Sequence, residues 1–125
     1  MSAQKNKTST EVFIALPLDA RKASMDVIMS KSQNKIPIII LFHSKLRKPS
    51  DLKKTRYLVA KGNKVSFFVA VLRKNMPDTD DTTSLYLFSN KKLLAGSTVL
   101  EQVYEADKSM DGVLYLTLAD VPSFG

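Results

Sequence analysis

Few side chains in this sequence could carry out catalysis. The single histidine, His43, is followed by Ser44, but neighbours in an extended segment point to opposite faces, so they form no base–nucleophile pair. The acidic run DTDD at 78–81 lacks the spacing and closing glutamate of a calcium loop, and we expect a solvated turn there. With no cysteine there is no thiol nucleophile, thiolate metal site or disulfide. We predict that the protein is not an enzyme and has no catalytic residue, metal or cofactor.

The C-terminal tail is a second place where chemistry could occur. The alternating run GVLYLTL is followed by a proline-containing tail, and the last residue is a bare glycine, Gly125. Tails of this kind usually fray, and a chance glycine is the plain alternative, because glycine makes up about 7% of average proteins. The segments ahead of the tail decide between these two interpretations.

The charges are distributed unevenly along the chain. The net charge is +7, but residues 1–75 hold 16 Lys and Arg against 4 Asp and Glu, whereas residues 76–125 hold 3 against 8. The first part is therefore at +12 and the second at −5. A basic half of this kind either meets an acidic partner or is a solvated face. No nucleic-acid-binding motif or interleaved exposed aromatics accompany it, so we expect no nucleic-acid partner.

The sequence predicts neither secretion nor a membrane span. The first ten residues, MSAQKNKTST, are polar and do not resemble a signal peptide. The longest apolar run, IPIIILF at 36–42, is far too short to cross a bilayer. We expect a single cytoplasmic domain, which 125 residues are enough to build around a core of its own.

Hydrophobic spacing predicts an α+β domain. Two helical pieces are expected between Glu11 and Lys31, separated near Pro17. The second piece is predicted to bury one face, formed by Ala20, Ala23, Val27 and Ile28. Strands are predicted at 35–42, 55–60, 84–89 and 112–118, and further helices at 64–75 and 96–107.

Two of the predicted helices carry cap signals. Asn63 precedes the helix at 64–75 and is expected to cap it. Thr98 and Glu101 have capping-box spacing at the start of the helix at 96–107. The buried stripe of the first helix is predicted to be Val65, Phe68, Val69 and Leu72, and that of the second Val99, Leu100, Val103 and Tyr104.

After the two N-terminal helices, the order ββαβαβ predicts a ubiquitin-like β-grasp roll. The handedness of crossovers places the first and last strands side by side and parallel at the sheet centre. The strand at 55–60 is then an edge, and the N-terminal helices are expected on the sheet face opposite the helix at 64–75. We predict a flexible start at 1–8, one domain at 9–121 with a helical extension at 9–31, and a flexible tail at 122–125.

Several stretches, taken in order, carry a resemblance to a known family. They are RKASMDVIMSKSQNKIPIII, KKTRYLV, FFVAVLRK, LYLFSN, VLEQVYEADKSMDGVLYLTL and the final SFG. Together these stretches resemble the GABARAP-type ubiquitin-like modifiers of autophagy, the autophagy-related protein eight family. The resemblance runs from about Leu18 to Gly125 in one register, with a small insertion at 43–54, and indicates a divergent member.

The resemblance implies a conjugation chemistry for the tail. In that family a cysteine protease exposes the terminal glycine, and activating and conjugating enzymes carry it as thioesters to phosphatidylethanolamine. Gly125 is then the conjugated residue and Phe124 a handle for the enzymes. A residue without a Cβ lets the backbone approach closely, which suits narrow channels leading to buried cysteines. The implied location is the cytoplasm, and the autophagosome membrane after lipidation.

The resemblance also implies peptide docking. Family members bind aromatic-x-x-aliphatic peptides of cargo receptors and adaptors, which add a strand to an exposed sheet edge. The aromatic pocket maps to Ile28, Pro37, Ile39, Arg56, Leu58 and Val113. The aliphatic pocket maps to Tyr57, Val59, Ala60, Phe68 and Val71. Arg56 and Lys54 would meet acidic residues beside such a peptide, and Tyr57 is expected to be exposed.

The sequence departs from the family pattern around both implied pockets. Val113 stands in place of the usual phenylalanine, Ala60 in place of a proline, and Asn63 in place of an apolar residue. Asn75 replaces an arginine, and SKSQNK lacks the usual Phe-Pro. Ile39, Phe68 and Val71 fit a core role as well as a pocket floor.

Two alternatives to lipid conjugation stay open at this point. The chain could be a modifier attached to a protein lysine, or a non-conjugated adaptor that binds peptides with the same fold. In each case we expect a monomer.

Overall fold

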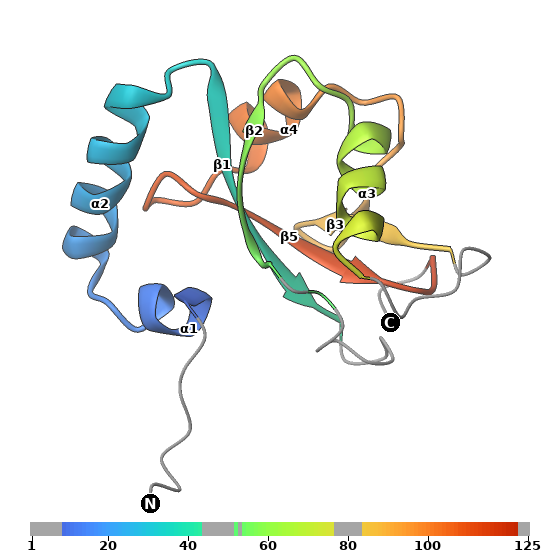
Figure 1. Ribbon diagram of the computed structural model, residues 1–125, viewed down its shortest axis with the longest axis horizontal. Helices are drawn as coiled ribbons and strands as arrows, with labels where there is room; N and C mark the ends of the chain where they lie inside the picture. Colours follow the sequence, from blue (N-terminus) through green and yellow to red (C-terminus); the bar gives the residue numbers. More distant parts are fainter. Residues whose placement is uncertain (1–8, 44–51, 53, 77–83, 123–125) are drawn as a thin grey trace, which may run out of the picture.

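The computed structural model describes residues 9–43, 52, 54–76 and 84–122 (Figure 1). The helices are α1 (Ser9–Ile14), α2 (Leu18–Lys31), α3 (Val65–Lys74) and α4 (Leu100–Asp107). The strands are β1 (Lys35–Phe42), β2 (Arg56–Ala60), β3 (Tyr86–Ser89), β4 (Lys92–Leu93) and β5 (Leu114–Ala119). They form one sheet in the order β2-β1-β5-β3-β4.

The centre of the sheet is the parallel pair β1 and β5, as the sequence predicts. Ile38 lies opposite Leu114, and the pairing continues to Phe42 opposite Leu118. β1 is buried from Ile36 to Ile40, since strands at the centre of such a sheet are covered on both faces. Among the described strands, β2 pairs only with β1 and forms one edge of the sheet, which confirms the predicted edge strand.

The other edge of the sheet, β4, is not foreseen in the sequence. Its two residues follow a tight turn in which Asn90 and Lys91 have φ of 50° and 68°. Asp107 at the end of α4 holds this turn by accepting hydrogen bonds from Ser89 Oγ at 2.7 Å and Asn90 Nδ2 at 3.1 Å. A strand of two residues leaves no periodicity to detect in a sequence.

The main core packs α3 and α4 against β1, β3 and β5. α3 buries Val65, Phe68 and Leu72, with Val69 partly buried beside them, so its predicted stripe is confirmed. α4 contributes Leu100 and Val103 to the same cluster.

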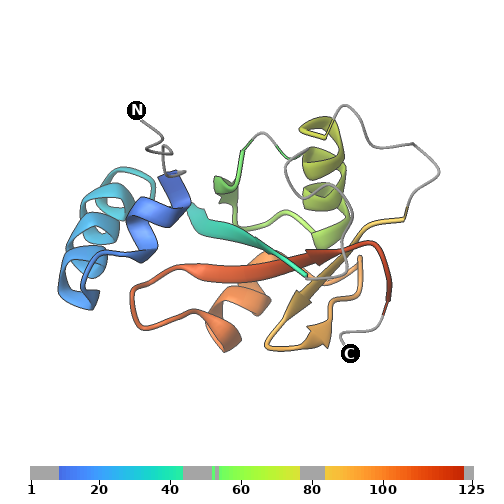
Figure 2. The same ribbon diagram turned by 90° about the horizontal axis from the view of Figure 1, so that it is seen from below.

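A second, smaller cluster holds α1 and α2 on the opposite face of the sheet. Phe13 and Met25 pack there on Ile39 and Val113. Ile39 alternates in β1 with Ile38 and Ile40, which belong to the main core, so the two clusters lie on opposite faces. Figures 1 and 2 show α1 and α2 on one side of β1 and α3 on the other, which is the predicted placement.

The predicted buried face of α2 is wrong at three of its four residues. Ala20 and Ala23 are exposed and Val27 is 59% exposed, whereas Met25 is buried and Ile28 half-buried. Phe13 of α1 covers part of the sheet face, so α2 needs only a narrow contact line there. Alanine side chains offer little apolar area to bury, so their spacing does not show which face of α2 packs on the sheet.

The predicted side-chain caps are also wrong. α3 begins at Val65 and α4 at Leu100, and neither has a side-chain cap hydrogen bond. The two helix starts satisfy each other instead: Val65 N donates to Thr98 O at 2.9 Å, and Leu100 N donates to Asn63 O at 2.8 Å. Backbone carbonyls from a distant segment thus replace Asn63 and Thr98 side chains as acceptors for otherwise unsatisfied amides.

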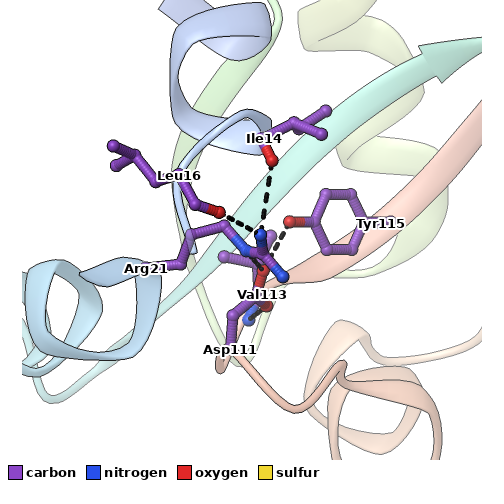
Figure 3. Close-up of polar contacts among 6 residues, drawn as sticks. All are labelled: Ile14, Leu16, Arg21, Asp111, Val113 and Tyr115. Atoms are coloured by element: carbon purple, nitrogen blue, oxygen red, sulfur yellow. Dashed lines mark hydrogen bonds and ion pairs between the residues drawn. The ribbon is translucent and has the colours of Figure 1, made fainter. Parts of the chain in front are cut away.

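A buried carboxylate ties the N-terminal helices to the sheet (Figure 3). Asp111 is 1% exposed and accepts hydrogen bonds from Arg21 Nε at 3.0 Å, Tyr115 Oη at 2.6 Å and Val113 N at 3.0 Å. Burial and the bond to Asp111 raise the pKa of the Tyr115 phenol above its ordinary value. Buried charges are tolerated when they are paired and hydrogen-bonded in this way.

The Arg21 guanidinium that binds Asp111 also contacts the turn between α1 and α2. Its Nη1 donates to the carbonyl oxygens of Ile14 at 3.3 Å and Leu16 at 2.5 Å. One guanidinium therefore connects the end of α1, the start of α2 and the loop before β5.

Asp111→Ala is expected to lower the free energy of unfolding by about 3 kcal/mol, because it leaves Arg21, Tyr115 and Val113 N without their acceptor. The matched control is Glu101→Ala, which breaks the surface pair Lys61 Nζ–Glu101 Oε2 at 3.7 Å, with side chains 43% and 44% exposed. Exposed pairs contribute about 0–1 kcal/mol. Urea denaturation measures both, and equal losses in the two variants would contradict the assigned role of Asp111.

Candidate functional site

β2 presents an open backbone edge. Ile40 N donates to Thr55 O at 2.8 Å and Lys61 N donates to Asn34 O at 3.0 Å, which marks the hydrogen-bonded pairs of the ladder with β1. In an antiparallel ladder these pairs alternate, so the amide and carbonyl groups of Arg56 and Leu58 face away from β1. No described strand pairs with that side, so a further strand could add there.

Pro37 fits this ladder without losing a hydrogen bond to β2. It lies opposite Leu58, in a pair that exchanges no backbone hydrogen bonds. The pairing of β1 with β5 starts one residue later, at Ile38. A proline near the start of a central strand is therefore accommodated, as expected from the sequence.

A hollow of about 610 Å³ lies beside this edge, between α2 and the strands β1 and β2. It is lined by eight residues implied by the resemblance, namely Ile28, Pro37, Ile39, Lys54, Arg56, Tyr57, Leu58 and Val113. Met25, Lys35 and Ile38 also line it and were not foreseen. Met25 is one helical turn before Ile28, and that spacing was the available signal.

The hollow has a cationic rim. Among the described residues that line it, Lys35, Lys54 and Arg56 are cations and none is a carboxylate. Lys54 Nζ lies 5.1 Å from the centre of the Tyr57 ring, and the Arg56 guanidinium lies 5.2 Å from that of the Phe13 ring. Cation–π contacts of this kind orient the charges and leave them able to meet an anion. The arrangement suits an acidic, partly apolar ligand.

Tyr57 is buried, and the expectation that it is exposed is wrong. Its ring packs edge-on against Phe68 at 5.1 Å, and its hydroxyl donates to Lys54 O at 2.6 Å. Burial raises the Tyr57 pKa to about 12, although a hydrogen bond from Asn75 acts in the opposite direction. The alternation of β2 explains the difference, because Tyr57 points toward α3 while Leu58 points away and is 42% exposed.

The residues of the implied aliphatic pocket are mostly core residues. Phe68 is fully buried, Val59 is buried, and Val71 is half-buried on α3. They lie with Tyr57 in the main core cluster between β2 and α3. Ala60 belongs to the other set of the β2 alternation, with Leu58, and is exposed. The structure therefore separates Ala60 from the rest of that set.

Several residues singled out in the sequence lie outside the described residues. They are Ser44, the run at 78–81, Phe124 and Gly125. His43 follows β1 directly and is buried. In the described ranges no three acidic or histidine side chains gather as a metal site, and no helix is long and apolar enough to cross a membrane.

Comparison with known sequences places the chain in a family. Residues 20–125 match the family described as autophagy protein Atg8, ubiquitin like. The chain belongs to the Atg8 family of ubiquitin-like proteins. The autophagy-related protein 8 of Dictyostelium discoideum is 34% identical over 109 residues, covering 87% of this chain and 88% of that protein. That of Candida glabrata is also 34% identical and covers 87% and 91%.

Solved Atg8 structures share the fold. Trypanosoma brucei Atg8 superposes with a TM-score of 0.80 at 22% identity, covering 96% of this chain and 100% of that one. Plasmodium falciparum Atg8, solved in complex with a Plasmodium falciparum Atg3 peptide, gives a TM-score of 0.77 at 23% identity, covering 90% and 97%. The ubiquitin-like α+β fold and the resemblance to a divergent autophagy family member are confirmed.

Tyr57→Phe is expected to reduce the alkaline loss of stability. The folded pKa of about 12 lies above the ordinary value of 10.0, so the folded state holds this proton more tightly, and stability falls as pH rises between the two. The difference in unfolding free energy between wild type and Tyr57→Phe should shrink from pH about 8 to about 11. Urea denaturation at both pH values measures it. Val71→Ala serves as a control, because it removes no titrating group, and its difference in unfolding free energy from wild type should stay the same at both pH values. A Tyr57→Phe difference that also stays the same would contradict the prediction.

Proposed function

We propose that this Atg8 family member is conjugated through Gly125 to phosphatidylethanolamine and docks acidic aromatic-x-x-aliphatic peptides along β2. The observation that carries the docking proposal is the cationic hollow beside the open edge of β2. The peptides would come from cargo receptors and adaptors. The proposed enzyme partners are the activating and conjugating enzymes and the processing cysteine protease of this pathway. The Atg3 peptide bound to Plasmodium falciparum Atg8 supports a contact with the conjugating enzyme.

The spacing of the proposed peptide motif follows from strand geometry. A peptide strand added to β2 would bond to the outward backbone groups of Arg56 and Leu58. Side chains of a strand alternate between faces, so residues three positions apart point to opposite faces of the sheet. The aromatic side chain would enter the hollow beside α2, whereas the aliphatic one would lie toward α3, near Tyr57 and Val71. Both faces of the edge are therefore used.

The cations around the hollow support a preference for peptides with acidic residues beside the motif. Lys35 lies at the start of β1, and Lys54 precedes β2, so cations stand near both ends of the β1–β2 pairing. Charges at the rim of an interface mainly speed association and select partners, rather than adding much affinity.

The proposed conjugation would supply membrane attachment to a chain whose described helices do not span a bilayer. Phosphatidylethanolamine has two acyl chains, which anchor a protein where a single chain is marginal. Basic residues near the surface would add about 1 kcal/mol each with anionic lipids. The protein would then move from the cytoplasm to autophagosomal membranes upon lipidation.

Arg56→Glu and Leu58→Ala are each expected to weaken binding of an acidic aromatic-x-x-aliphatic peptide by about tenfold or more. The first sets a carboxylate against the acidic residues of the peptide, and like charges placed together in an interface are strongly unfavourable. The second removes an exposed wall of the hollow, a loss that costs about 1–2 kcal/mol at an anchoring position. Titration calorimetry measures the affinity. Leu93→Ala is the matched control, since Leu93 is 48% exposed on β4 at the opposite sheet edge. Unchanged affinity in both groove variants would refute the docking site.

Deletion of Gly125 should abolish ATP-dependent transfer to phosphatidylethanolamine liposomes in the presence of the activating and conjugating enzymes. Gly125→Ala should slow transfer, because a Cβ hinders close approach of the backbone. The unfolding temperature should not change, since β5 ends well before this residue, at Ala119. Transfer that survives the deletion would overturn the mechanism. A thioester passed to protein lysines instead of lipid would favour a protein modifier, and the absence of any thioester would favour an adaptor.

A further inference from the structure

α3 exposes an aromatic side chain that has no place in either pocket implied by the resemblance. Phe67 is 51% exposed, whereas its neighbour Phe68 is fully buried. Val71 follows Phe67 by four residues, so the two lie on the same flank of the helix, one turn apart. A half-exposed phenylalanine next to a half-buried valine forms an apolar strip on the surface of α3.

The orientation of α3 directs this strip toward the β2 side. Ser66 lies on the other flank, where its amide donates to Gly96 O at 2.9 Å and its Cβ lies close to Gly96. Counted from Ser66 at about 100° per residue, Phe67 lies about 100° and Val71 about 140° around the helix, between the outward face and the buried Phe68 at about 200°. The ring of Tyr57 on β2 lies 5.1 Å, centre to centre, from that of Phe68, the buried residue next to this strip, so the strip lies on the side of α3 that packs on β2.

The surroundings of the strip are strongly cationic. The segment 54–75, which includes β2 and α3, contains no Asp or Glu. Its cations are Lys54, Arg56, Lys61, Lys64, Arg73 and Lys74, of which Lys61 already pairs with Glu101 of α4 at 3.7 Å. Lys64 and Lys74 are exposed at the two ends of α3, on either side of Phe67 along the helix. A ligand that covers this strip is therefore expected to carry negative charge.

We propose that Phe67 forms a third side-chain site for an acidic peptide strand on β2. It would take an apolar residue two positions from the aliphatic residue of the motif, and it rests on the proposed docking function. Residues two apart on a strand are about 6.6 Å apart on the same face, and residues four apart on a helix are about 6 Å apart along its axis. A peptide strand could thus set one side chain beside Val71 and the next on that face beside Phe67.

Asn63 leaves the implied aliphatic pocket with less apolar surface, which Phe67 could replace. It is half-buried just before α3, at the position where the sequence resemblance would place an apolar wall of the aliphatic pocket. Phe67, on the first turn of the helix, supplies apolar area close to that position. The chain would then prefer peptides with three apolar residues over those with two.

The test compares two protein forms with three synthetic acidic peptides in a fluorescence-anisotropy titration. One peptide has only the motif Trp-Ser-Thr-Leu. A second has a further leucine two positions after the motif leucine, and a third has leucine in place of the motif serine, two positions before it. The second and third, each with a third apolar residue, are called the extended peptides. Wild type should bind one of the extended peptides about three- to tenfold more tightly than the short one, and Phe67→Gln should remove that gain while leaving the short peptide within about twofold. The extended peptide that gains affinity reports the direction of the strand.

The control variant is Leu93→Gln, since Leu93 is similarly exposed but lies on the far edge strand β4. It should keep the full gain. If the short peptide binds, but neither added leucine improves binding in a manner that depends on Phe67, the third site is wrong and the docking function stands. If no peptide binds wild type at all, the docking function fails, and the third site with it.

Discussion

The parallel pairing of β1 with β5 is the constraint on which the rest of the structure depends. Two parallel strands at the centre of a sheet need cover on both faces, because neither face can be left to water. One face is covered by α3 and α4 in the main core, and the other by Phe13 and Met25 of the N-terminal helices. With both sides of β1 paired, β2 is left as an outer strand, and its open edge is a consequence of this order.

The alternation of β2 divides the candidate site between two different environments. Tyr57 and Val59 point into the core below α3, whereas Leu58 is exposed beside the hollow next to α2. The N-terminal helices thus do more than cover the sheet, since Met25 and Ile28 form one wall of that hollow. Their position depends on Arg21 and Asp111, which join the α1–α2 turn to the loop before β5. The bond between Arg21 and Asp111 therefore also fixes the helix that forms this wall of the hollow.

Charge and apolar surface coincide along the same edge. Arg56 lies over Phe13 and Lys54 over Tyr57, so each cation is held close to the hollow without a carboxylate partner among its lining residues. Of the ten cations that the structure describes in the first 75 residues, six belong to the segment 54–75, which contains β2 and α3. The proposed acidic peptide strand would pair with the backbone edge, fill the hollow and meet its cations.

The sequence by itself determined what local periodicity can specify: the buried strand 36–40, the stripe of α3 and the α+β order that makes β2 an edge. The resemblance further indicated eight residues around the hollow. Tertiary structure alone decided the burial of Tyr57, the choice of Met25 over the alanines of α2, and the reciprocal caps at Val65 and Leu100. It also decided the buried bond between Arg21 and Asp111, ninety positions apart. These features depend on partners distant in the chain, whose contacts exist only once the sheet register has brought them together.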